Sequence, residues 1–328
     1  MWSVLIVITA IITAVSTYIA IRYETNRGIL CRDVHKNNVY VPCIGGISLL
    51  IGISVPLLAA TLLKHSVEAL AVLLACSIAT IVGLVDDLKD LDVAAKLLFA
   101  ALASIPILVL HTYDPHPWIP FVGTTRLTII YPLLIVAAYT VIINGANMID
   151  THNGVLVTLA MSTIAGGLVL YAMKWHTDTR FYVYLCILAA LAAYSYFNLY
   201  PSKIFNGNAG SYLIGAILSS FAIVMNMEVF TILALMPMFT NGFYYISSVK
   251  GLLKKEYVPR PIVVRNGVIE PSTDAKAPLT LARLTVVMIS RPVSEKELVV
   301  TLTLIFVLNT LLAMVVVECL SAIPPLHH

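Results

Sequence analysis

The chain has 328 residues, of which 59% are hydrophobic and only 11% are charged, and its formal net charge is +3. Soluble domains carry about 25% charged residues, so an ordinary soluble enzyme is excluded, and so small a net charge gives no reason to expect binding to nucleic acid. The five cysteines lack the paired spacing typical of zinc sites and disulfide frameworks. The composition therefore predicts an all-α integral membrane protein with a single polytopic domain over residues 1–328.

Apolar segments long enough to cross a bilayer recur along the whole chain. The first of them, residues 2–21, has no basic residue before it and is followed by Arg22, which favours a retained span over a cleaved signal peptide. We expect about ten transmembrane helices, at residues 2–21, 43–63, 69–85, 94–110, 127–143, 154–173, 181–200, 209–226, 228–248 and 297–318.

Basic residues are distributed unevenly between the loops. Loops that follow odd-numbered spans hold sixteen of the 20 lysines and arginines, and nine of these lie in residues 250–296. Because cytoplasmic loops carry the excess of basic residues, we expect both termini outside the cell membrane and the odd-numbered loops in the cytoplasm. All the unusual polar segments belong to this cytoplasmic set, namely residues 33–46, 86–96, 144–154, 202–211 and 250–296.

The segment 33–46 follows the first span and carries Lys36, Pro42 and Gly45–Gly46. Lys36 is suited to hold an anion, and the proline and glycines let the backbone turn tightly into the next span. The same residues also fit a basic loop that touches anionic lipid, so this segment by itself leaves both readings open.

Acidic side chains cluster where the third predicted span ends, in the sequence IVGLVDDLKDLDVAAK. Ionisable groups at the end of a span are costly unless they meet a partner, an ion or water. The cluster therefore indicates a site for a metal ion and phosphates. The alternative is a hydrated helix end in which Asp86 pairs with Lys89 and Asp92 with Lys96.

The segment 144–154, NGANMIDTHNG, places Asn144, Asn147 and Asp150 along one face of a continuing helix. Amide carbonyls and carboxylates are the hard oxygen ligands that Mg²⁺ prefers beside substrate phosphates. A well-capped turn between two spans is the alternative.

The segment 202–215 contains a glycine-rich turn immediately before a predicted span. Backbone N–H groups freed at the start of a helix form a seat for an anion, here around Gly207 and Asn208. Phe205 offers a flat apolar surface on which a nucleobase can stack. A flexible turn that only starts a helix remains the alternative.

The ninth predicted span contains Pro237 and Asn241–Gly242, which should kink or break it. A broken helix at membrane depth is tolerated where it lines a cavity.

The loop 249–296 is the only long loop, and it carries predicted structure of its own. RPIVVRNGVIEP predicts a β-hairpin with a type I′ turn at Asn266–Gly267, and residues 279–289 predict an amphipathic helix at the membrane interface. Ser294 and Glu297 have the spacing of a capping box that opens the last span.

Taken in order, these motifs resemble those of the polyprenyl-phosphate N-acetylhexosamine-1-phosphate transferases, glycosyltransferase family 4, which are ten-span enzymes. The closing stretch PLTLARL…SEKELVVTLTLIF is similar to the archaeal and eukaryotic dolichyl-phosphate GlcNAc-1-phosphate transferases. The residues that carry the resemblance are Asp33, Lys36, Pro42 and Gly45–Gly46; Gly83–Asp87 with Lys96; Asn144, Asn147, Asp150 and Gly154; and Phe205, Gly207, Asn208, Gly210 and Ser211.

The resemblance implies a role for each matching residue. Asp86 and Asp87 would lie beside the lipid phosphate, with one of them a candidate base, and Asn147 with Asn208 would ligate Mg²⁺, or Mn²⁺ in its place. Lys96 and Arg260 would hold the diphosphate. Phe205 would stack on uracil and Asn153 would bond its edge. The predicted catalytic residues are Asp86, Asp87 and Lys96; the substrate-binding residues are Lys36, Asp150, Asn153, Phe205, Gly207, Arg260 and Arg265; and the metal ligands are Asn147 and Asn208.

Two departures from the family pattern matter. Asn208 stands where the family has a metal-binding aspartate, so Asp86, Asp87 or Asp150 must supply the missing negative charge. Residues 250–296 contain no histidine, whereas the bacterial cell-wall branch has a histidine-rich motif there, which argues against a muramyl-peptide substrate. The basic residues of this loop, including Arg260 and Arg265, either clamp a diphosphate or only mark its topology.

The resemblance implies transfer of GlcNAc-1-phosphate from UDP-GlcNAc to a polyprenyl phosphate such as dolichyl phosphate, as in the first membrane step of N-glycosylation, by a membrane-embedded homodimer. Another UDP-HexNAc donor, a non-catalytic lipid-binding relative, and a membrane transporter are the alternatives. A transporter predicts charged residues deep within the spans, whereas here they gather at one side.

Overall fold

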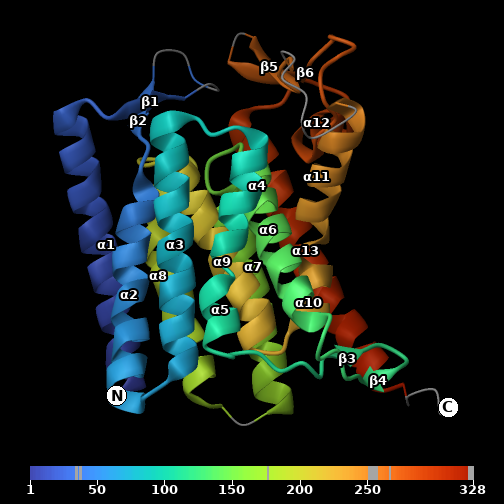
Figure 1. Ribbon diagram of the computed structural model, residues 1–328. Coiled ribbons are helices and arrows are strands. Elements are labelled where there is room, and N and C mark those ends of the chain that lie inside the picture. The colour runs from blue at the N-terminus through green and yellow to red at the C-terminus, as the bar shows by residue number, and fades with distance from the viewer. Residues whose placement is uncertain (34–35, 37–38, 176, 250–257, 266, 324–328) are drawn as a thin grey trace.

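The computed structural model describes residues 1–33, 36, 39–175, 177–249, 258–265 and 267–323, and long apolar helices dominate it (Figure 1). A helix satisfies its own backbone hydrogen bonds, which is what a chain in hydrocarbon requires. Eight helices in this part of the chain are long and apolar enough to cross a membrane: α1 (Trp2–Arg27), α2 (Gly45–Lys64), α3 (Val67–Lys89), α6 (Tyr131–Ile149), α7 (Val155–Lys174), α8 (Thr179–Asn198), α9 (Gly207–Val224) and α13 (Glu295–Ser321).

The predicted ninth span is a bent pair, α10 (Glu228–Ala234) and α11 (Met236–Val249), whose axes meet at 59°. The break precedes Pro237, as predicted, whereas Asn241–Gly242 lies inside α11. Asn309 of α13 donates its side-chain amide to the carbonyls of Leu233 and Ala234, both at 2.9 Å. The carbonyls that the break frees are thus satisfied by protein rather than left in hydrocarbon.

The predicted span at 94–110 is divided into α4 (Val93–Leu102) and α5 (Ile105–Val109), and Pro106 lies in the first turn of α5. Neither helix alone is long enough to span a bilayer. Together they lead from the end of α3 to the opposite end of the bundle (Figure 1). The total of ten spans therefore stays a prediction.

Helix α9 forms the centre of the bundle, against α3, α6, α2 and α7. In its 18 residues 89% of positions are buried, compared with 17% in the most apolar stretch of α1. The sequence of α9 is apolar on all sides and rich in Gly, Ala and Ser, and small residues let helices approach closely where water supplies no driving force. This central helix begins at the predicted glycine-rich turn.

Within the described residues, three short antiparallel hairpins join the helices: β1 (Leu30–Arg32) with β2 (Tyr40–Pro42), β3 (Trp118–Ile119) with β4 (Gly123–Thr124), and β5 (Ile262–Arg265) with β6 (Val268–Pro271). The last of these is the predicted hairpin, although position 266 of its turn lies outside the described residues. Helix α12 (Leu281–Ile289) occupies the predicted helical segment, and the predicted capping box of Ser294 and Glu297 is present.

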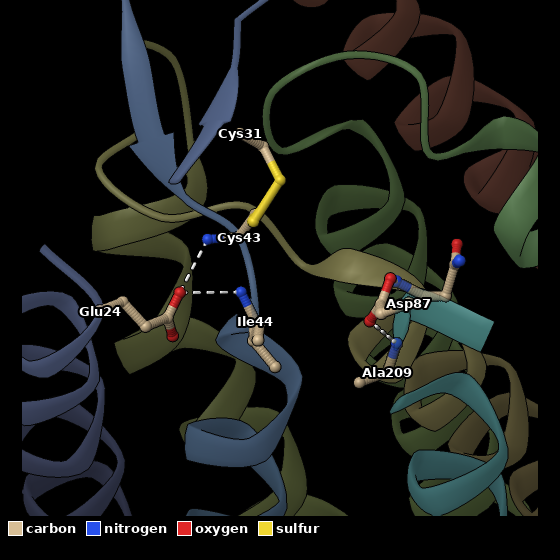
Figure 2. Close-up of a disulfide and its surroundings, with 7 residues drawn as sticks. Glu24, Cys31, Cys43, Ile44, Asp87 and Ala209 are labelled. Atoms are coloured by element: carbon tan, nitrogen blue, oxygen red, sulfur yellow. Dashed lines mark hydrogen bonds between the residues drawn. A yellow bond between two sulfur atoms is a disulfide. The ribbon is translucent and has the colours of Figure 1, made fainter. Parts of the chain in front are cut away.

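Cys31 and Cys43 form a disulfide across the first hairpin (Figure 2). The prediction that the cysteines form no disulfide was therefore wrong. The pairing of β1 with β2 brings the two Cα atoms to 5.7 Å, within the normal range for a disulfide. The two cysteines are 12 positions apart in the chain, and this spacing carried no sign of the contact.

The polar segments gather at one end of the bundle. Hairpins β1–β2 and β5–β6, the α3–α4 connection and α12 lie at the top of Figure 1. At the bottom, α1 begins on the left and α13 ends on the right, near β3–β4. This arrangement agrees with the expected grouping of the polar loops on one face. Which side of the membrane this face meets stays a prediction.

Candidate active site

A pocket of about 500 Å³ lies where four of the polar segments meet. Its wall includes residues from the β1–β2 hairpin, the end of α3, the α6–α7 loop and the α8–α9 loop. Of the predicted site residues, seven line it: Asp87, Asn147, Asp150, Asn153, Phe205, Gly207 and Asn208.

Asp87, near the end of α3, contacts the first turn of α9 through its side chain. Its carboxylate accepts hydrogen bonds from the backbone N–H groups of Asn208 at 2.8 Å and Ala209 at 3.0 Å (Figure 2). The positive end of a helix dipole favours a carboxylate at this place. The anion seat predicted at the glycine-rich turn is thus filled by a side chain of α3, which joins the two helices.

Asp86 has a different partner. Its buried Oδ1 lies 3.1 Å from Lys96 Nζ and accepts the backbone N–H of Leu91 at 2.9 Å. Lys96 Nζ also lies 3.8 Å from the fully exposed Asp90. Asp92 caps α4 by accepting the N–H of Ala95, so the pairings expected of a simple hydrated helix end are not the ones that form here.

Asn147 and Asn208 face each other across the pocket wall. The Asn147 amide nitrogen donates to Asn208 Oδ1 at 2.7 Å and to Ser211 Oγ at 3.0 Å. Asn144 does not join them, because its amide donates back to the carbonyl of Thr140 in α6. Of the three residues expected along one face, Asn147 and Asp150 line the pocket and Asn144 does not.

Asp150 lies just beyond α6 and meets Asn206, a buried residue that the sequence did not single out. The Asn206 amide nitrogen donates to both carboxylate oxygens, at 2.9 and 3.0 Å, while Tyr194 donates its hydroxyl to Asn206 Oδ1. Burial raises the pKa of Asp150 to about 7 against the opposing effect of the Asn206 hydrogen bond. The only sequence signal for Asn206 was its place next to the glycine-rich turn.

Lys36 takes part in an ionic cluster behind the pocket. Its Nζ lies 2.7 Å from Asp33 Oδ2 and 3.3 Å from Glu295 Oε2. Burial lowers the pKa of Lys36, but the hydrogen bond to Asp33 and the attraction of both acids raise it above its ordinary value overall. Glu295 also accepts a hydrogen bond from the Asn153 amide nitrogen at 2.9 Å, so the cluster reaches the pocket wall.

Another buried acid, Glu24 of α1, holds the backbone at the start of α2. Its Oε2 accepts the backbone N–H groups of Cys43 at 2.8 Å and Ile44 at 3.0 Å (Figure 2). The backbone of Phe205 in turn bonds to Pro42. The start of α2 and the α8–α9 loop are thereby joined, which presents Phe205 to the pocket.

Comparison with known proteins identifies the region that carries this pocket. The family model of glycosyl transferase family 4 matches residues 69–226. Residues 69–226 belong to glycosyl transferase family 4. This family 4 region runs from α3 to the end of α9 and contains all seven predicted residues of the pocket wall, whereas Lys36, Arg260 and Arg265 lie outside it.

Individual relatives of the chain are phospho-sugar transferases by name. A protein of Saccharolobus solfataricus, provisionally named UDP-N-acetylglucosamine–dolichyl-phosphate N-acetylglucosaminephosphotransferase, is 29% identical over 66% of this chain and 69% of its own. A phospho-N-acetylmuramoyl-pentapeptide-transferase of Petrotoga mobilis is 27% identical over 70% of this chain and 76% of its own. A Bacillus subtilis protein, provisionally named undecaprenyl-phosphate N-acetylglucosaminyl 1-phosphate transferase, is 25% identical over 77% and 70%.

The family 4 match over residues 69–226 and the apolar helices together indicate a multi-pass membrane protein. Not every predicted site residue lines its pocket. Arg265 is 64% exposed and lies 3.6 Å from Glu270 across the hairpin, and Arg260 is exposed as well. Their role toward a diphosphate stays a prediction, as does that of Lys96.

The donor atoms of the family 4 site suit Mg²⁺. Asn147 and Asn208 contribute amide oxygens and Asp87 a carboxylate, which are hard ligands. Asn208 Oδ1 accepts the Asn147 amide in this arrangement, so binding of one ion by both amide oxygens requires that the Asn147 side chain turn over. The residues therefore fit the metal in type.

Proposed function

We propose that this family 4 protein transfers GlcNAc-1-phosphate from UDP-GlcNAc to a polyprenyl phosphate, dolichyl phosphate in the first place, and releases UMP. The product is a GlcNAc-diphospho-lipid, as in the first membrane step of N-glycosylation. The observation that carries the proposal is the meeting of four separate motif segments at one pocket, three of them within the family 4 region. The name of the Saccharolobus relative supports this donor and acceptor.

The pocket suits a nucleotide sugar in size and lining. Ligand pockets commonly have volumes of about 300–1,000 Å³, and this one has about 500 Å³. In our proposal uracil stacks on Phe205 and its edge meets Asn153. Lys36, Arg260 and Arg265 attract the diphosphate, and Asp150 with Gly207 shapes the floor.

The reaction is a phosphoryl transfer in which an oxygen of the lipid phosphate forms a bond to the β-phosphorus of the UDP-sugar. The bond between that phosphorus and the bridging oxygen breaks, and UMP leaves with the electron pair. The sugar C1–O bond is untouched, so the anomeric configuration is retained. A phosphate monoester is already largely ionised at neutral pH, since its second pKa is about 6. Positioning by Asp86, Asp87 and Lys96 therefore matters more than a strong base.

Mg²⁺ held by Asn147 and Asn208, or Mn²⁺ in its place, would supply charge stabilisation to the diphosphate. Lys96 is placed to add positive charge once a substrate competes with Asp86 for it. We further propose that the end of the bundle that carries the pocket, called the site end below, faces the cytoplasm. There a soluble nucleotide and a lipid headgroup can meet.

The test is release of UMP by the purified full-length protein supplied with UDP-GlcNAc, polyprenyl phosphate and Mg²⁺. We expect UMP and a GlcNAc-diphospho-lipid in equal amounts, and neither without the lipid phosphate. Parallel reactions with UDP-GalNAc and UDP-glucose identify the donor. Absence of UMP with every donor would overturn the proposal, and uptake of intact UDP-sugar into proteoliposomes would indicate a transporter.

A further inference from the structure

Glu295 connects three segments that are far apart in the chain. It is the first residue of α13, its side chain is 6% exposed, and it contacts both Asn153 in the α6–α7 loop and Lys36 in the β1–β2 connection. Glu297, only two residues further along, is exposed and serves the helix cap through Ser294 and Arg291. The two glutamates therefore have different surroundings, and only Glu295 reaches the pocket wall.

The bond from Asn153 to Glu295 determines which end of the amide faces a ligand. A side-chain amide has one donating and one accepting end, whereas an ionised carboxylate only accepts. Lys36 and the first turn of α13 both favour the ionised form of Glu295. The Asn153 nitrogen must therefore turn to Glu295, and Oδ1 is the atom left for the pocket. Among the hydrogen bonds of the described residues, none is made to this oxygen.

We propose that Glu295 is a positioning residue that makes Asn153 a hydrogen-bond acceptor toward the nucleobase and thereby selects uracil over cytosine. The inference rests on the proposed function, in which Asn153 meets the edge of the base. Uracil carries an N–H group at ring position 3, which can donate to Oδ1. Cytosine carries an unprotonated nitrogen there, so two acceptors would oppose each other in a buried place.

The exocyclic amino group of cytosine does not remove this conflict. In the proposed arrangement Oδ1 faces ring position 3, so the amino group at position 4 can meet it only if the ring shifts along Phe205. Leaving a buried acceptor without a donor weakens binding by about 10- to 100-fold. We therefore expect the wild-type protein to prefer UMP to CMP by at least that factor, and UDP-GlcNAc to CDP-GlcNAc in kcat/KM likewise.

The experiment measures UMP and CMP binding by calorimetry with the purified full-length protein and its Glu295→Gln variant, with Glu297→Gln as the matched control. Glutamine has the size of glutamate, but its amide can donate as well as accept, so Asn153 is free to turn over. We expect Glu295→Gln to lower the UMP-to-CMP affinity ratio about tenfold or more, in part through stronger CMP binding. Glu297→Gln should leave the ratio unchanged.

Asn153→Ala provides a second, independent reading should Glu295→Gln fold poorly. It should bring the ratio close to one, and the double variant should lower it no further, because the glutamate acts through the amide. Equal loss of UMP and CMP binding in Glu295→Gln would overturn the inference and leave Glu295 a structural link. A wild-type ratio in Asn153→Ala, or no binding of either nucleotide, would overturn it too.

The outcome also separates this inference from the proposed function. A Glu295-dependent preference for UMP without any sugar-phosphate transfer would support a uridine nucleotide site and refute the transferase. Transfer from UDP-GlcNAc with an unchanged base preference in Glu295→Gln would refute only the inference.

Discussion

Asp86 and Asp87 are neighbours in the chain, yet each has its own partner. Asp87 joins α3 to the start of α9, whereas Asp86 is paired with Lys96 below the pocket wall. Neutralising Asp86 should therefore have a different consequence from neutralising Asp87. Loss of Asp87 removes a helix contact as well as a charge, so Asp86 gives the cleaner test of chemistry.

We predict that Asp86→Asn lowers kcat by about 100-fold or more, because it removes the charge that holds Lys96 in place beside the reactants. Asp90→Asn is the matched control, since Asp90 lies 3.8 Å from the same lysine but is fully exposed. UMP release at saturating substrate measures both. Equal rates in Asp86→Asn and the wild type would remove this pair from the site.

Asn208 gives a prediction about the metal. Asn208→Asp retains an oxygen that can accept the Asn147 amide and adds a negative charge beside Asp87. A further anionic ligand strengthens binding of a hard cation. We expect activity to persist and the Mg²⁺ concentration for half-maximal rate to fall about tenfold, measured by Mg²⁺ titration of UMP release. An unchanged or higher half-maximal Mg²⁺ concentration would place Asn208 outside the coordination shell.

At the scale of elements, α9 organises the bundle because its neighbours approach it almost backbone to backbone. A side chain added at Gly46 in α2 would overlap the backbone of Gly210, and one added at Gly83 in α3 would overlap that of Asn208. The glycines of two different motifs are thus required by the same close packing around the start of α9. Their role is to bring the motifs together rather than to contact a ligand.

We predict that Gly46→Ala destabilises the protein by about 1–3 kcal/mol through overpacking. Gly242→Ala is the control, because a Cβ at Gly242 in α11 meets open space and alanine favours a helix. Thermal unfolding in detergent should show a lower midpoint for the first variant and an unchanged or higher one for the second. Equal midpoints would show that α2 can move away from α9 at no cost.

At the scale of the whole molecule, the polar segments of the site gather at one side of the bundle. Helix α1 starts and helix α13 finishes at the opposite side (Figure 1). With the excess of basic residues at the site end, the positive-inside rule predicts that this end is cytoplasmic. The proposed donor is a soluble nucleotide sugar, so the orientation is also required by the function.

Labelling of single cysteines in intact cells checks this orientation. In a Cys319→Ser background, we expect an impermeant maleimide to label His116→Cys, and to label Asp90→Cys only after permeabilisation. Both positions are well exposed, with His116 48% and Asp90 100% accessible. Labelling of Asp90→Cys from outside would reverse the topology and contradict a cytoplasmic site.

Much of the site was predictable because its motifs are local. Asn147, Asn208 and Phe205 stand in short polar segments between apolar runs, and such segments are conspicuous in a membrane chain. The prediction for Arg260 and Arg265 depended mainly on their charge, and a charge alone does not say whether a side chain faces a pocket or solvent. Here Arg265 lies beside Glu270 on its hairpin.

The sequence by itself determined the fold class and the grouping of polar segments on one face, because hydrocarbon demands long apolar helices and their alternation decides which loops share a side. The tertiary structure alone decided the pairings: Cys31 with Cys43, Asp87 with the start of α9, and Glu295 with Asn153. Each of these joins segments whose distance along the chain is unrelated to their distance in space. Side-chain partners depend on that second distance, which only the packing of the helices fixes.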